Sequence, residues 1–128
     1  MPKCKIDLEA SPTFKKILEG YKRKYPKLLA DLKDAFDKIE EHYDSAAHAD
    51  AIPGFARTVW KYRWKSSDLR RGAQGGLRII ALCDPDKNSL YPLFVYSKVE
   101  KEDVSAKEIR EAVEELKANL QGTPNEDR

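Results

Sequence analysis

The sequence contains few of the residues that support metal, redox or disulfide chemistry. Its 128 residues include two cysteines, two histidines and one methionine. Cys4 and Cys83 form no C-x-x-C motif, and His42 and His48 do not share a helical face. We therefore expect no structural zinc, no cofactor and no Cys–His nucleophile pair. Each cysteine is expected to be a small buried hydrophobic residue, and each histidine to be exposed to solvent.

Long apolar runs and targeting signals are missing as well. The longest apolar stretch, around Leu77–Cys83, is far too short to span a bilayer. The first residues lack the charged start, apolar stretch and cleavage site of a secretory signal, so we expect a cytoplasmic protein that contacts no membrane. The length predicts one domain, residues 1–120, followed by a polar tail, residues 121–128. A 41% hydrophobic content allows a core without disulfide or metal.

The net charge of +2 hides a strong segregation of charge along the chain. Residues 53–98 carry nine lysines and arginines against three acids, and residues 1–25 have four more bases than acids. Residues 26–52 and 99–128 each have four more acids than bases. A basic middle segment between acidic ones favours a polyanionic partner.

The first half of the sequence predicts a short strand and two helices. Alternation over Lys3–Glu9 predicts the strand, and Ser11-Pro12 is typical of a helix start, with apolar spacing that continues to Lys24. Pro26 begins a second amphipathic helix that runs to Tyr43. Residues 44–54 then form a connector with a turn at Pro53-Gly54.

The second half predicts three strands and a last helix. The strands cover Val59–Lys65, Leu77–Leu82 and Leu90–Ser97, and Pro92 indicates an edge position or a bulge in the third. Ser105 and Glu108 have the spacing of a capping box. The order β-α-α-β-β-β-α predicts an α+β fold in which a helical hairpin packs on a small, mainly antiparallel sheet, with the helices on one face.

Alternation in the first of these strands gives it one aromatic and one cationic face. The aromatic face is expected in the core and consists of Trp60, Tyr62 and Trp64. The cationic face is expected on the open side of the sheet and consists of Lys61, Arg63 and Lys65. The alternative to a binding surface is an ordinary solvated strand face.

A meander would bring further cations to this open face. They lie in the glycine-rich loop or at strand ends: Arg70, Arg71, Arg78 and Lys98, with Tyr96 beside them. We expect a cationic concavity without a nearby carboxylate, interrupted only by Asp68. Arginine and lysine can stabilise a phosphorane, a lysine crowded by cations can transfer protons, and tyrosine can donate one. RNA cleavage by 2′-OH attack is therefore feasible.

Four short motifs occur here in a consistent order: Trp60-Lys-Tyr-Arg63, Ser67-Asp-Leu-Arg-Arg-Gly72, Gly75-Gly-Leu-Arg-Ile-Ile80 and Val95-Tyr-Ser-Lys98. In these motifs residues 53–105 resemble the RelE/ParE toxin superfamily, and within it the HigB-like branch. The resemblance implies a RelE-like microbial ribonuclease fold and a type II toxin that cleaves mRNA on the ribosome.

The resemblance also implies roles and partners. The catalytic set would comprise Lys61, Arg63, Arg78, Tyr96 and Lys98, and the RNA- or ribosome-binding set Lys65, Arg70 and Arg71. No metal or cofactor is implied. The implied partners are mRNA on the ribosome and a cognate antitoxin, a small DNA-binding protein whose acidic segment covers the basic face in a hetero-oligomer.

Two alternatives stay open at the level of sequence. A ParE-like chain would inhibit DNA gyrase instead of cutting RNA. The second alternative is a non-catalytic RNA- or protein-binding relative of these toxins. Val99 and Ser105 favour it, because they stand where RelE-type toxins carry catalytic residues.

Overall fold

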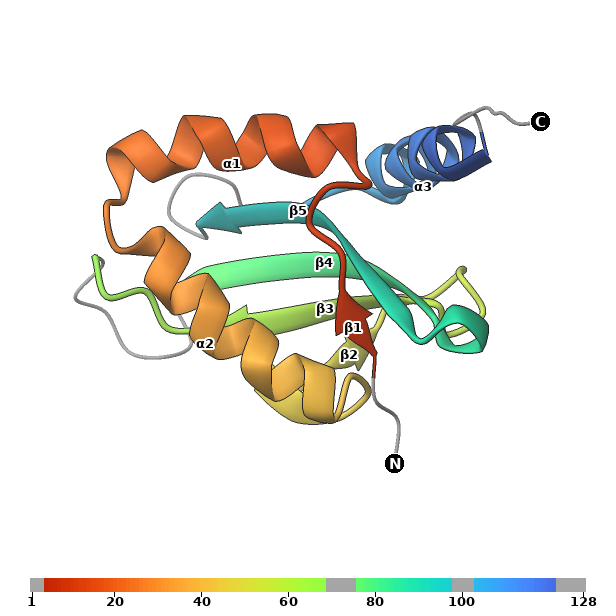
Figure 1. Ribbon diagram of the computed structural model, residues 1–128, viewed down its shortest axis with the longest axis horizontal. Coiled ribbons are helices and arrows are strands. Elements are labelled where there is room, and N and C mark those ends of the chain that lie inside the picture. Colours follow the sequence, from red (N-terminus) through yellow and green to blue (C-terminus); the bar gives the residue numbers. More distant parts are fainter. Residues whose placement is uncertain (1–3, 69–75, 98–102, 122–128) are drawn as a thin grey trace.

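The fold is a five-stranded sheet with helices on both faces (Figure 1). The computed structural model describes residues 4–68, 76–97 and 103–121. The helices are α1 Pro12–Lys24, α2 Leu28–Glu41 and α3 Ala106–Gln121; the strands are β1 Lys5–Ile6, β2 Asp50–Ala51, β3 Val59–Trp64, β4 Leu77–Asp84 and β5 Ser89–Ser97. The predicted α+β fold is confirmed.

The sheet has the order β1-β5-β4-β3-β2. Strands β3, β4 and β5 form the predicted antiparallel meander, β2 adds an antiparallel pair to β3, and β1 runs parallel to β5. The predicted strand Lys3–Glu9 is too long, because the Glu9 amide donates to Asp7 Oδ1 at 2.9 Å and turns the chain away after Ile6. The predicted connector 44–54 also contains a 3-10 turn, Ala46–His48, and β2.

A bulge in β5 follows Pro92, as predicted. Ile80 pairs with Phe94 and Ala81 with Pro92, so Leu93 is the extra residue on the bulged strand. Proline has no N–H to donate to a ladder, and β1 has already ended beside Leu90. The extra residue shifts the alternation of β5 by one position, and this shifted register puts Tyr96 opposite Arg78.

Local capping explains where α1 and α3 begin. The Phe14 amide donates to Ser11 Oγ at 3.2 Å, and Pro12 occupies the first turn, where its missing N–H is harmless. At α3, the Ser105 amide donates to Glu108 Oε1 at 3.0 Å, while the Glu108 amide donates to Ser105 Oγ at 3.1 Å. Both predicted caps are confirmed.

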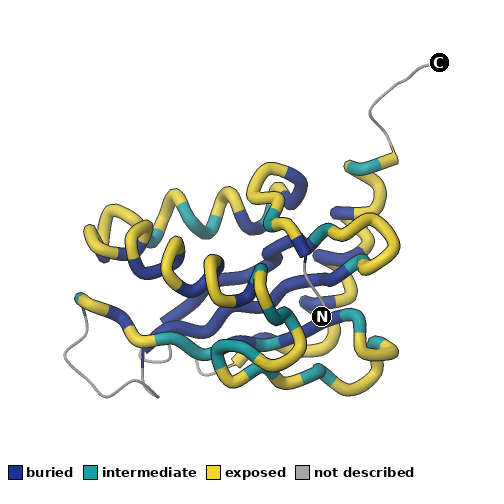
Figure 2. Tube along the Cα trace, turned by 60° about the horizontal axis from the view of Figure 1, so that its bottom comes forward, coloured by how far each residue is buried: buried dark blue, intermediate teal, exposed yellow. Residues whose placement is uncertain are grey.

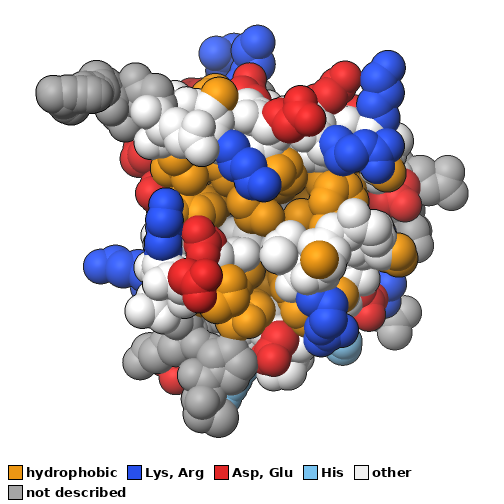
Figure 3. All heavy atoms as spheres, turned by 90° about the vertical axis from the view of Figure 1, so that its right-hand side faces the viewer, with side chains coloured by type: hydrophobic (Ala, Val, Ile, Leu, Met, Phe, Trp, Pro, Cys, Tyr) orange, Lys and Arg blue, Asp and Glu red, His pale blue; other side chains and the backbone are white. Residues whose placement is uncertain are grey.

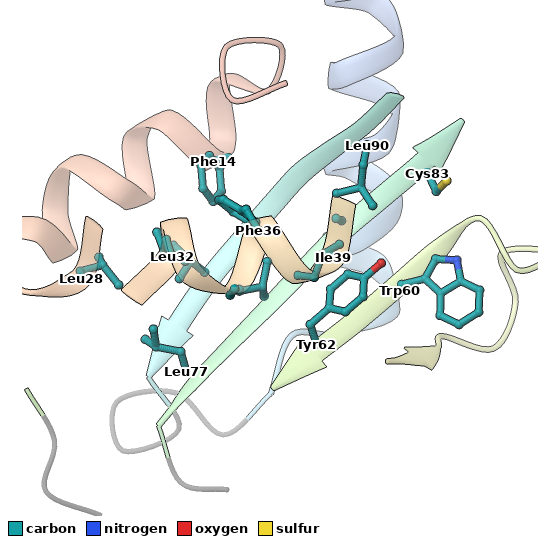
Figure 4. Close-up of a cluster of buried hydrophobic side chains, with 14 of the residues drawn as sticks. Phe14, Leu28, Leu32, Phe36, Ile39, Trp60, Tyr62, Leu77, Cys83 and Leu90 are labelled. Atoms are coloured by element: carbon teal, nitrogen blue, oxygen red, sulfur yellow. The ribbon is translucent and has the colours of Figure 1, made fainter. Parts of the chain in front are cut away.

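The core lies on both faces of the sheet. On the first face α1 and α2 cover a cluster that contains Phe14, Ile39 and Tyr62 (Figure 4). On the second face Ile109 and Leu116 of α3 pack in another cluster. The prediction that all helices share one face is wrong for α3. Strands β4 and β5 are buried almost without interruption (Figure 2), so both of their faces need cover.

Helix α3 covers only part of the second face. It lies toward the end of the sheet where β4 ends and β5 begins (Figure 1). The opposite end, where β3 and β5 end and β4 begins, lies away from it. None of the helices in the described ranges is long and apolar enough to cross a membrane.

Candidate functional site: a polar row across three strands

Four polar side chains lie on the second face of the sheet, and three of them are aligned across β3, β4 and β5. The register puts Arg63 of β3 opposite Arg78 of β4, and Arg78 opposite Tyr96 of β5. Lys61 lies two residues before Arg63 and therefore projects to the same face. Side chains directly opposite one another on antiparallel strands are in contact range. The structure thus brings together Lys61, Arg63, Arg78 and Tyr96; we call these four residues the polar row.

Arg78 is the least exposed cation of the polar row. The residue is only 7% exposed, and among the described residues its guanidinium makes one long hydrogen bond, from NH1 to Leu77 O at 3.4 Å. Burial lowers its pKa, and the neighbouring Arg63 lowers it further. Because an arginine pKa lies so far above neutrality, the group keeps its charge. No described carboxylate forms an ion pair with it.

Arg63 has unused donor capacity beside Arg78. Its Nε is buried and has no hydrogen-bond partner among the described residues. Its NH2 lies 3.7 Å from Asp50 Oδ2, which is a loose ion pair between partly exposed side chains. Among the described residues, the Arg63 Nε is therefore a buried donor left unsatisfied, and it belongs to the guanidinium opposite Arg78. A phosphate or carboxylate is the chemical class that satisfies such donors.

The expectation of a site without carboxylates is wrong. Asp103 Oδ1 accepts a hydrogen bond from Lys61 Nζ at 3.2 Å and another from the Tyr96 hydroxyl at 3.2 Å. Asp50 pairs opposite Lys61 in the β2–β3 ladder and faces the same side. Sequence reasoning missed both acids because one lies in the segment taken as a connector and the other just before α3. Asp68 is not in the site; it accepts from the Lys27 amide at 3.1 Å.

The hydrogen bonds of the polar row shift two pKa values in opposite directions. Burial tends to raise the pKa of Asp103, but hydrogen bonds from the Val104 amide, Lys61 and Tyr96 outweigh it, so the pKa is lowered. Burial, followed by the Asp103 charge, raises the pKa of Tyr96 to about 12. At neutral pH the pair is therefore a carboxylate and a protonated phenol. Lys61 Nζ donates to the Asp103 carboxylate and forms an ion pair with it.

Two hollows border the polar row. Asp50, Lys61 and Asp103 line a cavity of about 250 Å³ beside the start of α3. Arg63, Lys65 and His48 line an open groove of about 540 Å³. Lys65 is exposed and lies just beyond the end of β3. His48 was not singled out from the sequence as a site residue; it lies in the 3-10 turn Ala46–His48 and lines this groove.

Several predicted features cannot be placed. Arg70, Arg71 and Lys98 lie outside the described residues, as do residues 122–128 of the predicted tail 121–128, whose first residue ends α3. Within the described ranges no group of three or more His, Cys, Asp or Glu side chains is arranged to hold a metal ion.

The end of the molecule remote from the polar row carries charges of both signs around a hydrophobic middle (Figure 3).

Comparisons of the chain with protein-family models, with curated proteins and with solved structures gave no match. A functional assignment therefore rests on the residues themselves.

Proposed function

We propose that this chain is the toxin of a type II toxin–antitoxin pair and acts as a ribosome-dependent mRNA endonuclease. The observation that carries the proposal is the buried Arg78 guanidinium beside the unpartnered Nε of Arg63. A buried charge without a partner destabilises a fold, so its presence favours a site that an anion completes. The motif resemblance to RelE/ParE toxins identifies that anion as an RNA phosphodiester.

The proposed reaction is an internal transesterification. The RNA 2′-oxygen attacks the adjacent phosphorus, the P–O5′ bond breaks, and the products are a 2′,3′-cyclic phosphate and a 5′-hydroxyl. Arg63 and Arg78 hold the charge that grows on the non-bridging oxygens. Asp103 takes the 2′-OH proton, and Tyr96 supplies a proton to the leaving 5′-oxygen. The Tyr96–Asp103 hydrogen bond then returns the proton to the phenol.

The ribosome and the antitoxin complete the proposal. The polar row has few groups that could orient a flexible RNA, so a ribosome that presents the mRNA would supply much of the rate through positioning. The antitoxin would neutralise the toxin through an acidic segment laid over Lys61, Arg63 and Lys65.

The test uses purified full-length chain and ribosomes that carry mRNA in the A site. We expect cleavage within codons by the native chain and loss of cleavage by about 100-fold or more in Arg78→Ala. Arg110→Ala removes an exposed arginine of α3 and should leave cleavage unchanged. Asp103→Asn should retain RNA binding but lose cleavage. An uncut mRNA at high concentrations of native chain overturns the proposal.

A parallel experiment separates the two alternatives. Induced expression in bacteria should arrest growth with broken mRNA and no DNA-damage response, and Arg78→Ala should relieve the arrest. Arrest with a DNA-damage response and loss of supercoiling would instead identify a gyrase inhibitor. Salt-sensitive RNA binding without cleavage would identify the non-catalytic relative.

A further inference from the structure

The two cysteines, 79 positions apart in the sequence, are in contact. Cys4 Sγ lies 3.3 Å from Cys83 Sγ, and both residues are buried and free. Cys83 is near the end of β4, where it pairs with Leu90, and Cys4 directly precedes β1, whose Lys5 pairs with Ser89. The two sulfurs thus meet at one end of the sheet, from strands on either side of β5. Cys83 belongs to the cluster under α1 and α2 (Figure 4).

We propose that Cys4 and Cys83 form an oxidative modification site, which a low-molecular-weight disulfide of the glutathione class converts into an intramolecular disulfide. A disulfide bond is about 2.05 Å long, so the sulfurs need to approach by about 1.3 Å. The backbone around Cys83 is held in the sheet, whereas Cys4 precedes a two-residue edge strand. The required movement falls on the Cys4 side, because β1 has only two residues and pairs with one strand.

A hollow gives the reagent a route to Cys4. Cys4, Lys5, Glu40 and Asn88 line an open cavity of about 470 Å³. The wall carries one base, Lys5, and one acid, Glu40. Cys83 is not among the residues that line the cavity; it is in contact with Cys4 and hydrogen-bonded to the Tyr43 side chain. Cys4 is therefore the sulfur that the reagent meets first.

The exchange has two balanced steps. The Cys4 thiolate attacks one sulfur of the reagent, the reagent's S–S bond breaks, and one thiol of the glutathione class leaves. Deprotonated Cys83 then attacks Cys4 Sγ in the mixed disulfide, and the second reagent thiol leaves as the Cys4–Cys83 bond forms. The two protons released go to solvent and the departing thiolates. Because burial raises the pKa of the Cys83 thiol, the second step is slow and accelerates with pH.

The bond would fasten β1 to the sheet without touching the polar row. The cysteines lie on the face under α1 and α2, at the end of β4, whereas Arg78 lies on the other face near its start. The disulfide should therefore raise the free energy of unfolding and the resistance of β1 to detachment. It should leave mRNA cleavage unchanged. This separation makes the inference independent of the proposed function.

The test incubates the full-length chain at pH 8.5 with oxidised and reduced glutathione at graded ratios. Intact mass under non-reducing conditions should fall by two hydrogens, with a transient single glutathione adduct. Cys83→Ser should stop at one adduct on Cys4, and Cys4→Ser should react more slowly. The oxidised native chain should unfold at a urea concentration higher by about 1–2 M than the reduced chain.

Four results would overturn the inference. They are free thiols at every glutathione ratio, a mixed disulfide that accumulates without closing, disulfide-linked dimers in place of the internal bond, and a lower urea midpoint after oxidation. Cys4→Ala and Cys83→Ala serve as second variants should either serine substitution unfold the chain.

Discussion

Arg78 combines properties that conflict in an ordinary core residue. It occupies a position that register and alternation place on a packed face, it is 7% exposed, and no described carboxylate forms an ion pair with it, while the charge of Asp103 favours its charged form from a longer range. Desolvation of an ion without a partner weakens a fold. An anionic ligand that pairs with Arg78 would explain why a destabilising charge stands at this position. The fold would then be more stable without the charge, whereas activity would require it.

This conflict predicts that Arg78→Met separates stability from activity. We expect the free energy of unfolding to stay unchanged or rise by about 1 kcal/mol, because an apolar side chain removes the buried charge. RNA cleavage should fall by about 100-fold or more. Urea denaturation and the ribosomal cleavage assay measure the two effects. A loss of stability as large as that of a core truncation would show that the guanidinium has a structural partner.

The Tyr96 phenol predicts a pH dependence of stability at alkaline pH. Its pKa is raised to about 12 in the folded chain, mainly by burial, against 10.0 for an ordinary tyrosine. The folded state therefore favours the protonated phenol, and this contribution is fully present below pH 10 and is lost as pH rises from 10 toward 12. The native chain should thus lose more stability over this range than Tyr96→Phe.

Urea denaturation of both chains from pH 8 to 11.5 tests the Tyr96 prediction, because the other tyrosines contribute equally to each. The two stability curves should run parallel below about pH 10 and converge above it. Curves that stay parallel over the whole range would mean that the Tyr96 hydroxyl titrates as in the unfolded chain.

At the scale of elements, the connection into β4 depends on a close backbone approach. A Cβ on Gly76 would lie 2.4 Å from the Ser66 amide nitrogen and 2.7 Å from Trp64 O, both of them backbone atoms. Neither atom can move without displacing the end of β3, which carries Arg63 one residue before Trp64. The absence of a side chain at residue 76 therefore lets β3 and β4 meet beside the polar row.

Gly76→Ala should accordingly lower the free energy of unfolding by about 2 kcal/mol or more, because the clash forces backbone shifts. Gly20→Ala is the matched control. Gly20 lies inside α1 with nothing within 4 Å of an added Cβ, so alanine there should stabilise by about 0.5–1 kcal/mol. Chemical denaturation compares the two. A Gly76→Ala variant as stable as the native chain would show that the backbone around residue 76 can shift at no cost in stability.

The small elements β1 and β2 have consequences beyond their length. Two residues of β1 place Cys4 against Cys83, and two residues of β2 place Asp50 opposite Lys61. Alternation over residues 3–9 predicts β1 with bounds that are too wide, whereas β2 is not recognised in the sequence, since two residues cannot show a period of two. Both contribute an unexpected partner to a site.

At the scale of the whole molecule, one sheet is shared by two hydrophobic clusters. Residues on alternate positions of β4 point into opposite clusters, for example Ile79 toward α2 and Ile80 toward α3. Loss of either helical layer exposes strands that the other layer needs for packing. The two clusters should therefore unfold together.

Leu116→Ala tests this coupling from the α3 side. Leu116 is fully buried, so the truncation should cost about 2–5 kcal/mol. Unfolding followed by far-ultraviolet circular dichroism and by the fluorescence of Trp60, which lies in the other cluster, should give coincident transitions. Leu29→Ala, at a 52% exposed leucine, should stay within about 0.5 kcal/mol. An early loss of helix without a fluorescence change would mean that α3 unfolds alone.

Features that depend on neighbours in the chain could be predicted from the sequence. Alternation in Val59–Trp64, the caps at Ser11 and Ser105 and the bulge at Pro92 follow from residues a few positions apart, and all agree with the structure. The α+β class followed from the same local signals, as did the placing of Lys61 and Arg63 on one strand face. Turn, cap and period signals act over one or two turns of chain.

Contacts between distant residues could be seen only once the chain was folded. The placement of α3 on the second face, the Asp103 carboxylate between Lys61 and Tyr96, and the Cys4–Cys83 contact all join segments 7 to 79 residues apart. The same charge pattern along the chain is compatible with a bare cationic face or with one partly neutralised by its own acids. The choice depends on strand register and helix packing, which minimise the exposed apolar surface of the whole molecule and which no local pattern encodes.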